Sequence, residues 1–152
     1  ETIMYSKKFH SLSESDTIAF AKEFAEHLSI NDIVTFIGEL GTGKTVFVKA
    51  ICEYFKVEEI VTSPTFTLIN QYIGNFRGKE FDIFHIDLYR INKLEEIQDL
   101  GFTELITTPN SLKLIEWAEK VIDLIPPPFY RVDFSNVENK EDERIITVNY
   151  IL

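Results

Sequence analysis

Residues 38–45 read GELGTGKT, and this spacing is typical of a loop that binds the phosphates of a nucleotide. The three glycines let the backbone curl so that several N–H groups point inward and form an anion cradle. We expect Lys44 to reach the β- and γ-phosphates and the Thr45 hydroxyl to bind Mg²⁺. The residues of this segment that we expect to contact the nucleotide are Glu39, Leu40, Gly41, Thr42, Gly43, Lys44, Thr45 and Val46.

Two acidic residues follow apolar runs, in IFHIDLYR and in LKLIEW. The carboxyl ends of strands open onto the crevice where α/β sheets bind ligands. We expect Asp87 to be the acidic residue next to the metal because it lies at the C-terminal end of its strand. Asp82 is a poorer choice because it lies near the start of the same strand. Glu116 completes the Mg²⁺ shell or orients the attacking water, and which of the two acids touches the metal directly stays open. The predicted metal ligands are thus Thr45, Glu116 and Asp87, and the predicted catalytic residues are Asp87, Glu116 and Lys44.

Other residues near these segments have two interpretations each. Ser63 and Thr65, in TSPTF, stand where switch-type NTPases sense the γ-phosphate, but composition alone favours a plain turn. His85 is expected to be a packed strand histidine and not a catalytic one. Trp117 is either part of the core or a lid over the nucleotide. Cys52 is expected in the core, and with one cysteine in the chain no zinc site is visible.

Hydrophobic periodicity places these motifs on alternating strands and helices. Strands are expected in residues 3–9, 32–37, 65–73, 80–89, 112–117, 129–134 and 144–152, and helices in 11–28, 46–55, 93–106 and 118–125. Ser13 and Asp16 form an S-x-x-D start signal for the first helix. A hairpin turn is expected between Gly74 and Gly78, a helix break near Gly101, and a charged loop at residues 136–143. The predicted fold class is α/β, a single P-loop NTPase domain over residues 1–152 with a mixed, partly parallel central sheet flanked by helices.

Bulk properties restrict the class of protein. The chain has 152 residues, 45% of them hydrophobic, which suits one globular domain. A single cysteine favours a reducing, cytoplasmic location. No apolar run reaches the ~20 residues that cross a bilayer, and we expect neither a signal peptide nor membrane contact. The net charge of −10 argues against broad binding of a nucleic-acid backbone.

Two well-known classes of P-loop protein fit poorly. Residues 92–95, NKLE, differ from the guanine-reading N-K-x-D by one residue and follow the Asp87 strand too early, and DLYR lacks the glycine of the GTPase switch. A small-molecule kinase needs several arginines in a lid, but the arginines here are few and well separated. Arg90, beside Asp87, is the expected internal phosphate contact. The alternatives that stay open are a nucleotide-gated binding module and a small-molecule kinase.

Five segments, in this order and at the expected distances, resemble the TsaE (YjeE) family, the bacterial ATPases for making threonylcarbamoyladenosine in tRNA. They are GELGTGKT, TSPTFTL, FHIDLYR, EEIQDLGF and LIEWAEK. The resemblance covers roughly residues 16–126, and about the last 25 residues of the chain match only in general character. This set of motifs is far more specific than the P-loop alone.

The resemblance implies a compact P-loop ATPase that binds ATP and Mg²⁺. By resemblance, Thr45 and Glu116 contact the metal and Asp87 supports hydrolysis. Residues 63–65 are similar to the family's switch I, which favours a switch over a plain turn. Thr17, near the start of the first helix, is expected to touch the nucleotide.

The resemblance also implies a protein partner. The family associates with the TsaD–TsaB pair and drives that complex through repeated cycles by ATP hydrolysis, without transferring the threonylcarbamoyl group itself. The acidic balance fits this role, because tRNA would be held by the partners and would meet this chain only indirectly. The small number of arginines indicates a slow ATPase whose site a partner completes.

Overall fold

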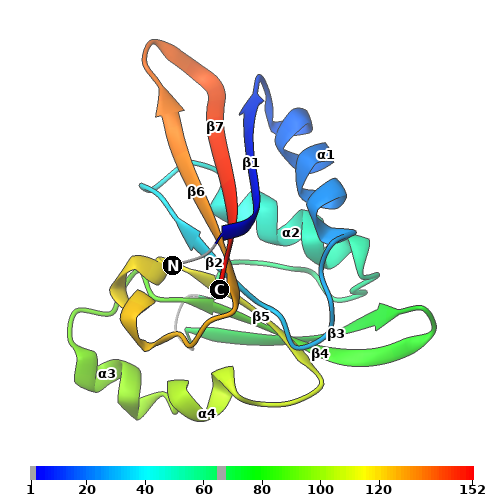
Figure 1. Cartoon of the computed structure of the whole chain (residues 1–152), viewed down its shortest axis with the longest axis vertical. Coiled ribbons are helices and arrows are strands. Elements are labelled where there is room, and N and C mark those ends of the chain that lie inside the picture. Colours follow the sequence, from blue (N-terminus) through cyan, green and yellow to red (C-terminus); the bar gives the residue numbers. More distant parts are fainter. Residues whose placement is uncertain (1–2, 65–67) are drawn as a thin grey trace.

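A seven-stranded sheet forms the centre of the molecule (Figure 1). The computed structural model describes residues 3–64 and 68–152. The strands are β1 (Ile3–Ser11), β2 (Ile33–Ile37), β3 (Ile69–Phe76), β4 (Lys79–Asp87), β5 (Ser111–Glu116), β6 (Phe129–Val137) and β7 (Lys140–Ile151). The helices are α1 (Glu14–Ala25), α2 (Lys44–Tyr54), α3 (Leu94–Asp99) and α4 (Phe102–Ile106), followed by the 3₁₀ turns η1 (Ala118–Lys120) and η2 (Ile122–Leu124).

The sheet has a parallel centre and antiparallel edges. Its strand order is β1-β7-β6-β2-β5-β4-β3. Strands β6, β2, β5 and β4 run parallel to one another, whereas β3, β7 and β1 each run antiparallel to a neighbour. Every residue of β5 is buried, as expected for a parallel strand that is covered on both faces. The predicted fold class, a mixed and partly parallel sheet flanked by helices, is confirmed.

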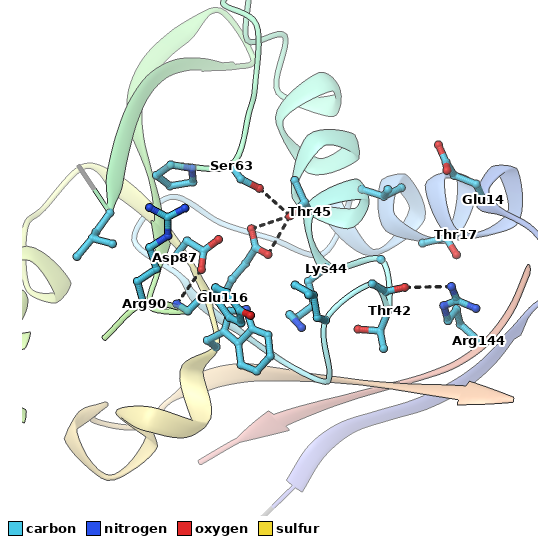
Figure 2. A pocket seen from close by; sticks show the side chains of 18 of the residues that line it. Glu14, Thr17, Thr42, Lys44, Thr45, Ser63, Asp87, Arg90, Glu116 and Arg144 are labelled. Atoms are coloured by element: carbon cyan, nitrogen blue, oxygen red, sulfur yellow. Dashed lines mark hydrogen bonds between the residues drawn. The ribbon is translucent and has the colours of Figure 1, made fainter. Parts of the chain in front are cut away.

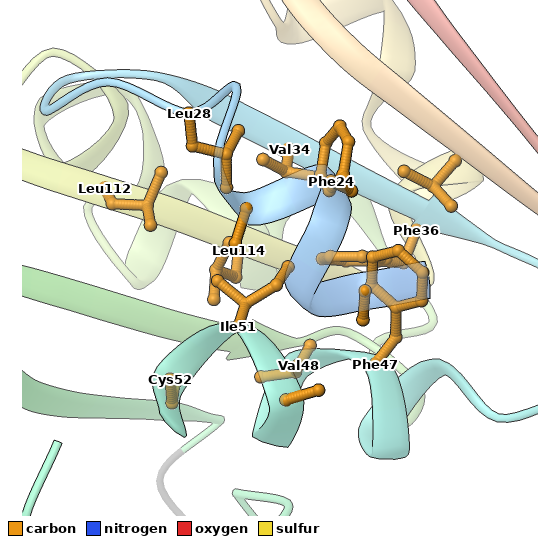
Figure 3. Packing of buried hydrophobic residues seen from close by; sticks show 14 of the residues in the cluster. Phe24, Leu28, Val34, Phe36, Phe47, Val48, Ile51, Cys52, Leu112 and Leu114 are labelled. Atoms are coloured by element: carbon orange, nitrogen blue, oxygen red, sulfur yellow. The ribbon is translucent and has the colours of Figure 1, made fainter. Parts of the chain in front are cut away.

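Helices cover both faces of the sheet and produce two apolar cores. On one face, α1 and α2 pack over β2 and β5, where Phe24 and Phe47 meet Phe36 and Leu114 (Figure 3). On the other face, α3 and α4 contribute to a second cluster that includes Ile115. Leu114 and Ile115 are adjacent, and they face opposite cores because side chains alternate along a strand. The same alternation decides which polar side chains of β4 and β5 face α2.

Helix α1 starts as its sequence signal predicts. The Ser13 Oγ accepts a hydrogen bond from the Asp16 backbone N–H at 3.1 Å. The Asp16 carboxylate in turn accepts a hydrogen bond from the Leu12 N–H at 2.9 Å. This resembles a capping box, except that the backbone donor is the residue before the N-cap Ser13. The hairpin between β3 and β4 is also confirmed, because Arg77 (φ 54°) and Gly78 (φ 82°) form its tight left-handed turn. Gly101, with φ 73°, breaks the helical segment between α3 and α4 as expected.

Two segments differ from the sequence-based prediction. Residues 118–125, expected as one helix, form η1 and η2, because Val121 between them has φ −132° and interrupts the helical path. Most of the charged stretch 136–143, expected as a loop, belongs to β6 and β7, and only residues 138–139 form the turn. Near this end Arg144 of β7 is paired with Ser11 of β1 and Asn136 of β6. Beyond Arg144 the two strands pair only with each other, and this pairing keeps the backbone extended despite side chains that favour loops.

Among the helices of the described residues, not one combines the length and apolarity that crossing a bilayer would demand.

Candidate functional site

The loop between β2 and α2 has the backbone geometry that its glycines predict. Gly43 precedes α2 with φ 100°, a conformation that side chains disfavour. Gly38 lies against β6, and a Cβ atom there would stand 2.9 Å from the carbonyl oxygen of Phe134. Glycine is therefore required at both positions for the loop to close around the start of α2. The loop therefore leads directly into the first turn of α2. The backbone N–H groups of a first helical turn have no partner within the helix, and such groups bind anions well.

Lys44 is held beneath this loop. The residue is 5% exposed, and its Nζ donates to the carbonyl oxygens of Gly38 and of Glu39, the latter at 2.8 Å. The same ammonium lies 4.1 Å from the centre of the Trp117 ring. Burial lowers the pKa of Lys44, and the nearby Glu116 carboxylate opposes that shift. A buried cation on a flexible stem, held only by neutral acceptors, can turn toward a phosphate without leaving a broken ion pair.

Thr45 and Glu116 are in direct contact at the start of α2. The Thr45 hydroxyl donates to the two carboxylate oxygens of Glu116 at 3.0 and 3.3 Å. Its oxygen also lies 3.1 Å from the Ser63 Oγ. A hydroxyl has one proton, so Ser63 is the donor in that second contact. The loop before β3 is thus joined to the P-loop helix at the predicted metal ligand.

Asp87 ends β4 beside the end of β5. The two strands are parallel, and Asp87 is in register with Glu116. Burial raises the pKa of Asp87, and the neighbouring Glu116 carboxylate raises it further, whereas a hydrogen bond from the Tyr89 N–H at 3.0 Å opposes the shift. Both predicted acids therefore reach the same edge of the sheet, the edge that carries the P-loop. Glu116 is the one that touches Thr45.

The donor set suits magnesium more than a transition metal. Within residues 3–64 and 68–152, no three His, Cys, Asp or Glu side chains converge to hold a metal ion. Mg²⁺ needs no such cage, because it keeps several waters and binds one or two carboxylates together with phosphate oxygens. The Thr45 hydroxyl and the Glu116 carboxylate, 3.0 Å apart, offer that kind of partial shell. These residues fit a magnesium ion that arrives with a nucleotide.

A cavity of about 480 Å³ joins these groups (Figure 2). Of the residues predicted from sequence, its lining includes Thr17, Leu40, Gly41, Thr42, Gly43, Lys44, Thr45, Val46, Ser63, Asp87, Arg90 and Glu116. Glu39 is not part of the lining and contributes only its carbonyl oxygen to Thr42 and Lys44. Thr65 lies outside the described residues. Trp117, for which two roles were open, is half-buried at the edge of the cavity and contacts Tyr89, with ring centres 4.9 Å apart.

The cavity has two chemically distinct ends. Figure 2 shows Ser63, Asp87, Arg90 and Glu116 on one side of the P-loop, and Glu14, Thr17 and Arg144 on the other. The two acids that would bind or adjoin a metal, Asp87 and Glu116, lie at the end that also contains Ser63 and Arg90. A triphosphate seated on the loop with its terminal phosphate near these acids would extend its nucleoside toward α1 and β7.

Several residues of the site were missed by sequence reasoning. Arg144, on β7, donates to the Gly41 carbonyl oxygen at 3.0 Å and so supports the P-loop from a strand that is remote in sequence. Lys120 donates to the carbonyl oxygens of Leu88, Tyr89 and Ile91 at 2.9, 2.8 and 2.7 Å. It thereby holds the loop that carries Arg90. No sequence signal identifies these long-range contacts.

His85 could have been found from sequence. It precedes Asp87 by two residues, and residues two apart in a strand share a face. Its imidazole is completely buried, and Nε2 lies 2.5 Å from the Glu116 Oε2. The prediction of a packed histidine is correct as to burial, but it missed the contact with a site carboxylate.

The chain is similar to known proteins over most of its length. The family model for threonylcarbamoyl adenosine biosynthesis protein TsaE matches residues 11–146. The tRNA threonylcarbamoyladenosine biosynthesis protein TsaE of Rickettsia conorii is 40% identical over 143 residues, which is 93% of this chain and 78% of that protein. The Bacillus subtilis protein of the same name is 32% identical over 144 residues, covering 95% and 85% of the two chains. The crystal structure of YdiB from Bacillus subtilis superposes with a TM-score of 0.75 at 26% identity, covering 100% of this chain and 89% of that one.

Proposed function

This chain belongs to the TsaE family of threonylcarbamoyl adenosine biosynthesis proteins, and from that premise we propose that it is a Mg²⁺-dependent ATPase that serves threonylcarbamoyladenosine modification of tRNA. One observation carries the ATPase part of the proposal. The Thr45 hydroxyl, at the end of a phosphate-binding loop, lies 3.0 Å from the Glu116 carboxylate, and Asp87 ends the neighbouring strand in register with it. This is the arrangement that phosphoryl transfer from a metal-bound triphosphate requires.

Each residue has a role that follows from its position. The backbone N–H groups after Gly41 bind phosphate oxygens, and Lys44 turns from the Gly38 and Glu39 carbonyls toward the phosphates. Thr45 and Glu116 hold the magnesium ion, which when bound neutralises charge on the β- and γ-phosphate oxygens. Asp87 orients the attacking water. The raised pKa of its half-buried carboxyl makes it a better proton acceptor than an exposed aspartate.

The proposed partner is the TsaD–TsaB complex, and tRNA meets this chain only through it. The relatives in Rickettsia conorii and Bacillus subtilis carry names that place them in this tRNA modification. A net charge of −10 is unfavourable for direct binding of a polyanion. Two arginines, Arg90 and Arg144, line the cavity, and Arg144 is engaged with the P-loop carbonyl. We infer that ATP hydrolysis is slow in the isolated chain and that the partner completes the site.

The test is phosphate release from ATP by the purified chain, with and without the TsaD–TsaB complex and Mg²⁺. We expect weak release alone and stimulation by the complex. Lys44→Ala abolishes nucleotide binding, whereas Glu116→Ala retains binding and stops turnover. Full-rate hydrolysis by the chain alone, unaffected by the complex, would contradict the partner part of the proposal.

The same variants separate the alternatives. In a nucleotide-gated binding module, Glu116→Ala would still bind its partner in the presence of ATP and would still support tRNA modification. In a coupling ATPase, that variant binds but does not cycle, so modification stops. A small-molecule kinase would instead produce a phosphorylated metabolite, which mass spectrometry of the reaction mixture detects.

A further inference from the structure

The imidazole of His85 is a polar group placed deep in an apolar sheet. Its side chain has 0% exposed surface, and the carboxylate that it contacts, Glu116, has 3%. Nδ1 of His85 is the one buried side-chain nitrogen or oxygen, among the described residues, without a hydrogen-bond partner. Burying a polar atom without a partner is unfavourable, because the atom loses its hydrogen bonds to water. An apolar residue would fill this position at lower cost, so the presence of histidine requires a reason beyond packing.

The strand register places His85 directly behind the metal-side acids. In the parallel pair of β4 and β5, His85 is opposite Leu114, and Asp87 is opposite Glu116. His85 therefore lies one pleat deeper than Asp87, on the face of the sheet that α2 covers. Glu116 is contacted from α2 by the Thr45 hydroxyl and from the interior of the sheet by His85.

The hydrogen-bond pattern assigns the proton. An ionised carboxylate only accepts hydrogen bonds, so the His85 Nε2 carries the hydrogen and donates to the Glu116 Oε2 at 2.5 Å. Nδ1 is then an acceptor without a donor, which is less costly than a buried N–H without an acceptor. The hydrogen bond from Nε2 therefore fixes the direction of the Glu116 carboxylate.

We propose that His85 is a positioning residue that holds the Glu116 carboxylate in the orientation that binds magnesium. Thr45 and His85 share the two oxygens of Glu116 unequally: Oε1 is nearer to Thr45, at 3.0 Å, and Oε2 is nearer to His85, at 2.5 Å. If the Thr45 oxygen and the nearer Glu116 oxygen both faced a metal, the hydrogen bond between them would be weakened. His85 would then be the contact that keeps the carboxylate in place. This inference deepens the proposed function and rests on Glu116 being a metal-side ligand.

Two substitutions separate positioning from packing. The amide nitrogen of glutamine reaches about as far as the histidine Nε2, whereas that of asparagine reaches only the position of Nδ1. His85→Gln therefore retains a donor to Glu116, and His85→Asn loses it, although both keep a buried amide. A residue that acted only as core filling would show no such difference in metal binding, because both replacements leave space in the core.

The measurement is calorimetric titration of the full chain with a non-hydrolysable ATP analogue at a series of Mg²⁺ concentrations. Loss of an outer partner of a metal ligand weakens metal binding by roughly 10–100-fold. We expect His85→Asn to raise the half-saturating Mg²⁺ concentration at least tenfold and His85→Gln to raise it less than about threefold. Affinity for the analogue in EDTA stays unchanged in both variants, because His85 is fully buried and is not among the residues that line the cavity.

Equal Mg²⁺ dependence in His85→Asn and His85→Gln would overturn the proposal, as would a parallel loss of affinity in EDTA. Should the asparagine variant not fold, NMR of the wild-type chain gives a second test. A strongly deshielded imidazole N–H proton is expected, and it persists when Mg²⁺ and the analogue are added. Its absence, or its loss on metal binding, refutes the proposal. Neither measurement requires hydrolysis, so a chain that binds Mg²⁺ and the analogue without turning over would contradict the ATPase proposal and leave this test intact.

Discussion

The contact between Thr45 and Glu116 can be tested without any ligand, through its effect on stability. Thr45→Val replaces the hydroxyl by a methyl group of nearly the same size and removes the proton that Glu116 accepts at 3.0 Å. Thr45→Ser is the matched control, because it keeps the hydroxyl and removes only the methyl group. Glu116 is 2% exposed, so water cannot readily replace the lost donor.

The expected loss in the free energy of unfolding follows from the number of hydrogen bonds that the substitution removes. The single Thr45 hydroxyl proton is shared between the two oxygens of Glu116, at 3.0 and 3.3 Å, so it counts as one hydrogen bond. The Ser63 hydroxyl, which donates to Thr45 at 3.1 Å, is half-buried and can donate to water instead, so its lost acceptor adds little. A hydrogen bond to a charged group contributes about 1.5–3 kcal/mol. His85 still donates to the same carboxylate at 2.5 Å, which places the loss in the lower half of that range. We expect Thr45→Val to lower the free energy of unfolding by about 1.5–2 kcal/mol, and Thr45→Ser by less than about 1 kcal/mol.

Urea denaturation at neutral pH, analysed by linear extrapolation, measures both variants on one scale. For a chain of this size, each 1 kcal/mol corresponds to roughly 2–4 °C in Tm, so thermal melting gives an independent check. Equal losses for valine and serine would refute the argument, because loss of the hydroxyl would then cost no more than loss of a methyl group. An unchanged stability in Thr45→Val would show that the carboxylate finds another donor.

Two further substitutions test other parts of the site. Burial raises the pKa of Asp87 above its ordinary 3.8, so the ionised form costs stability above that pH. Asp87→Asn should therefore stabilise the chain at pH 7, by under about 1 kcal/mol because the group is half-exposed, and the gain should vanish in melts at decreasing pH as the wild-type carboxyl becomes protonated. Lys120→Met removes three hydrogen bonds to the carbonyls of residues 88–91. We expect faster amide hydrogen exchange in that loop and affinity for an ATP analogue several-fold weaker; unchanged exchange would show that Lys120 does not hold the loop.

Much of the fold and the centre of the site could be predicted from the sequence, because the relevant information is local. The phosphate-binding loop is one contiguous segment between a strand and a helix, and its glycines are needed for backbone angles that other residues disfavour. The start of α1 and the hairpin at Gly78 depend on short-range hydrogen bonds and turn chemistry in the same way. Asp87 and Glu116 were identifiable because each ends a buried strand.

The tertiary structure alone decided how these segments meet. Periodicity indicates that β4 and β5 are strands, but only their pairing places Asp87 opposite Glu116 and sets His85 behind the carboxylate. The extended arm of β6 and β7, expected to be a charged loop, exists because these two strands pair with each other, and β7 brings Arg144 to the P-loop.

Such contacts join residues far apart in the chain, and no local propensity encodes them. Glu116 is 71 residues from Thr45, and Arg144 is 103 residues from Gly41. The sequence by itself therefore determined which chemical groups this protein has and on which elements they stand. The register of strands and the packing of α2 on the sheet determined which of these groups touch, because register is set by the burial of whole faces and not by any single residue.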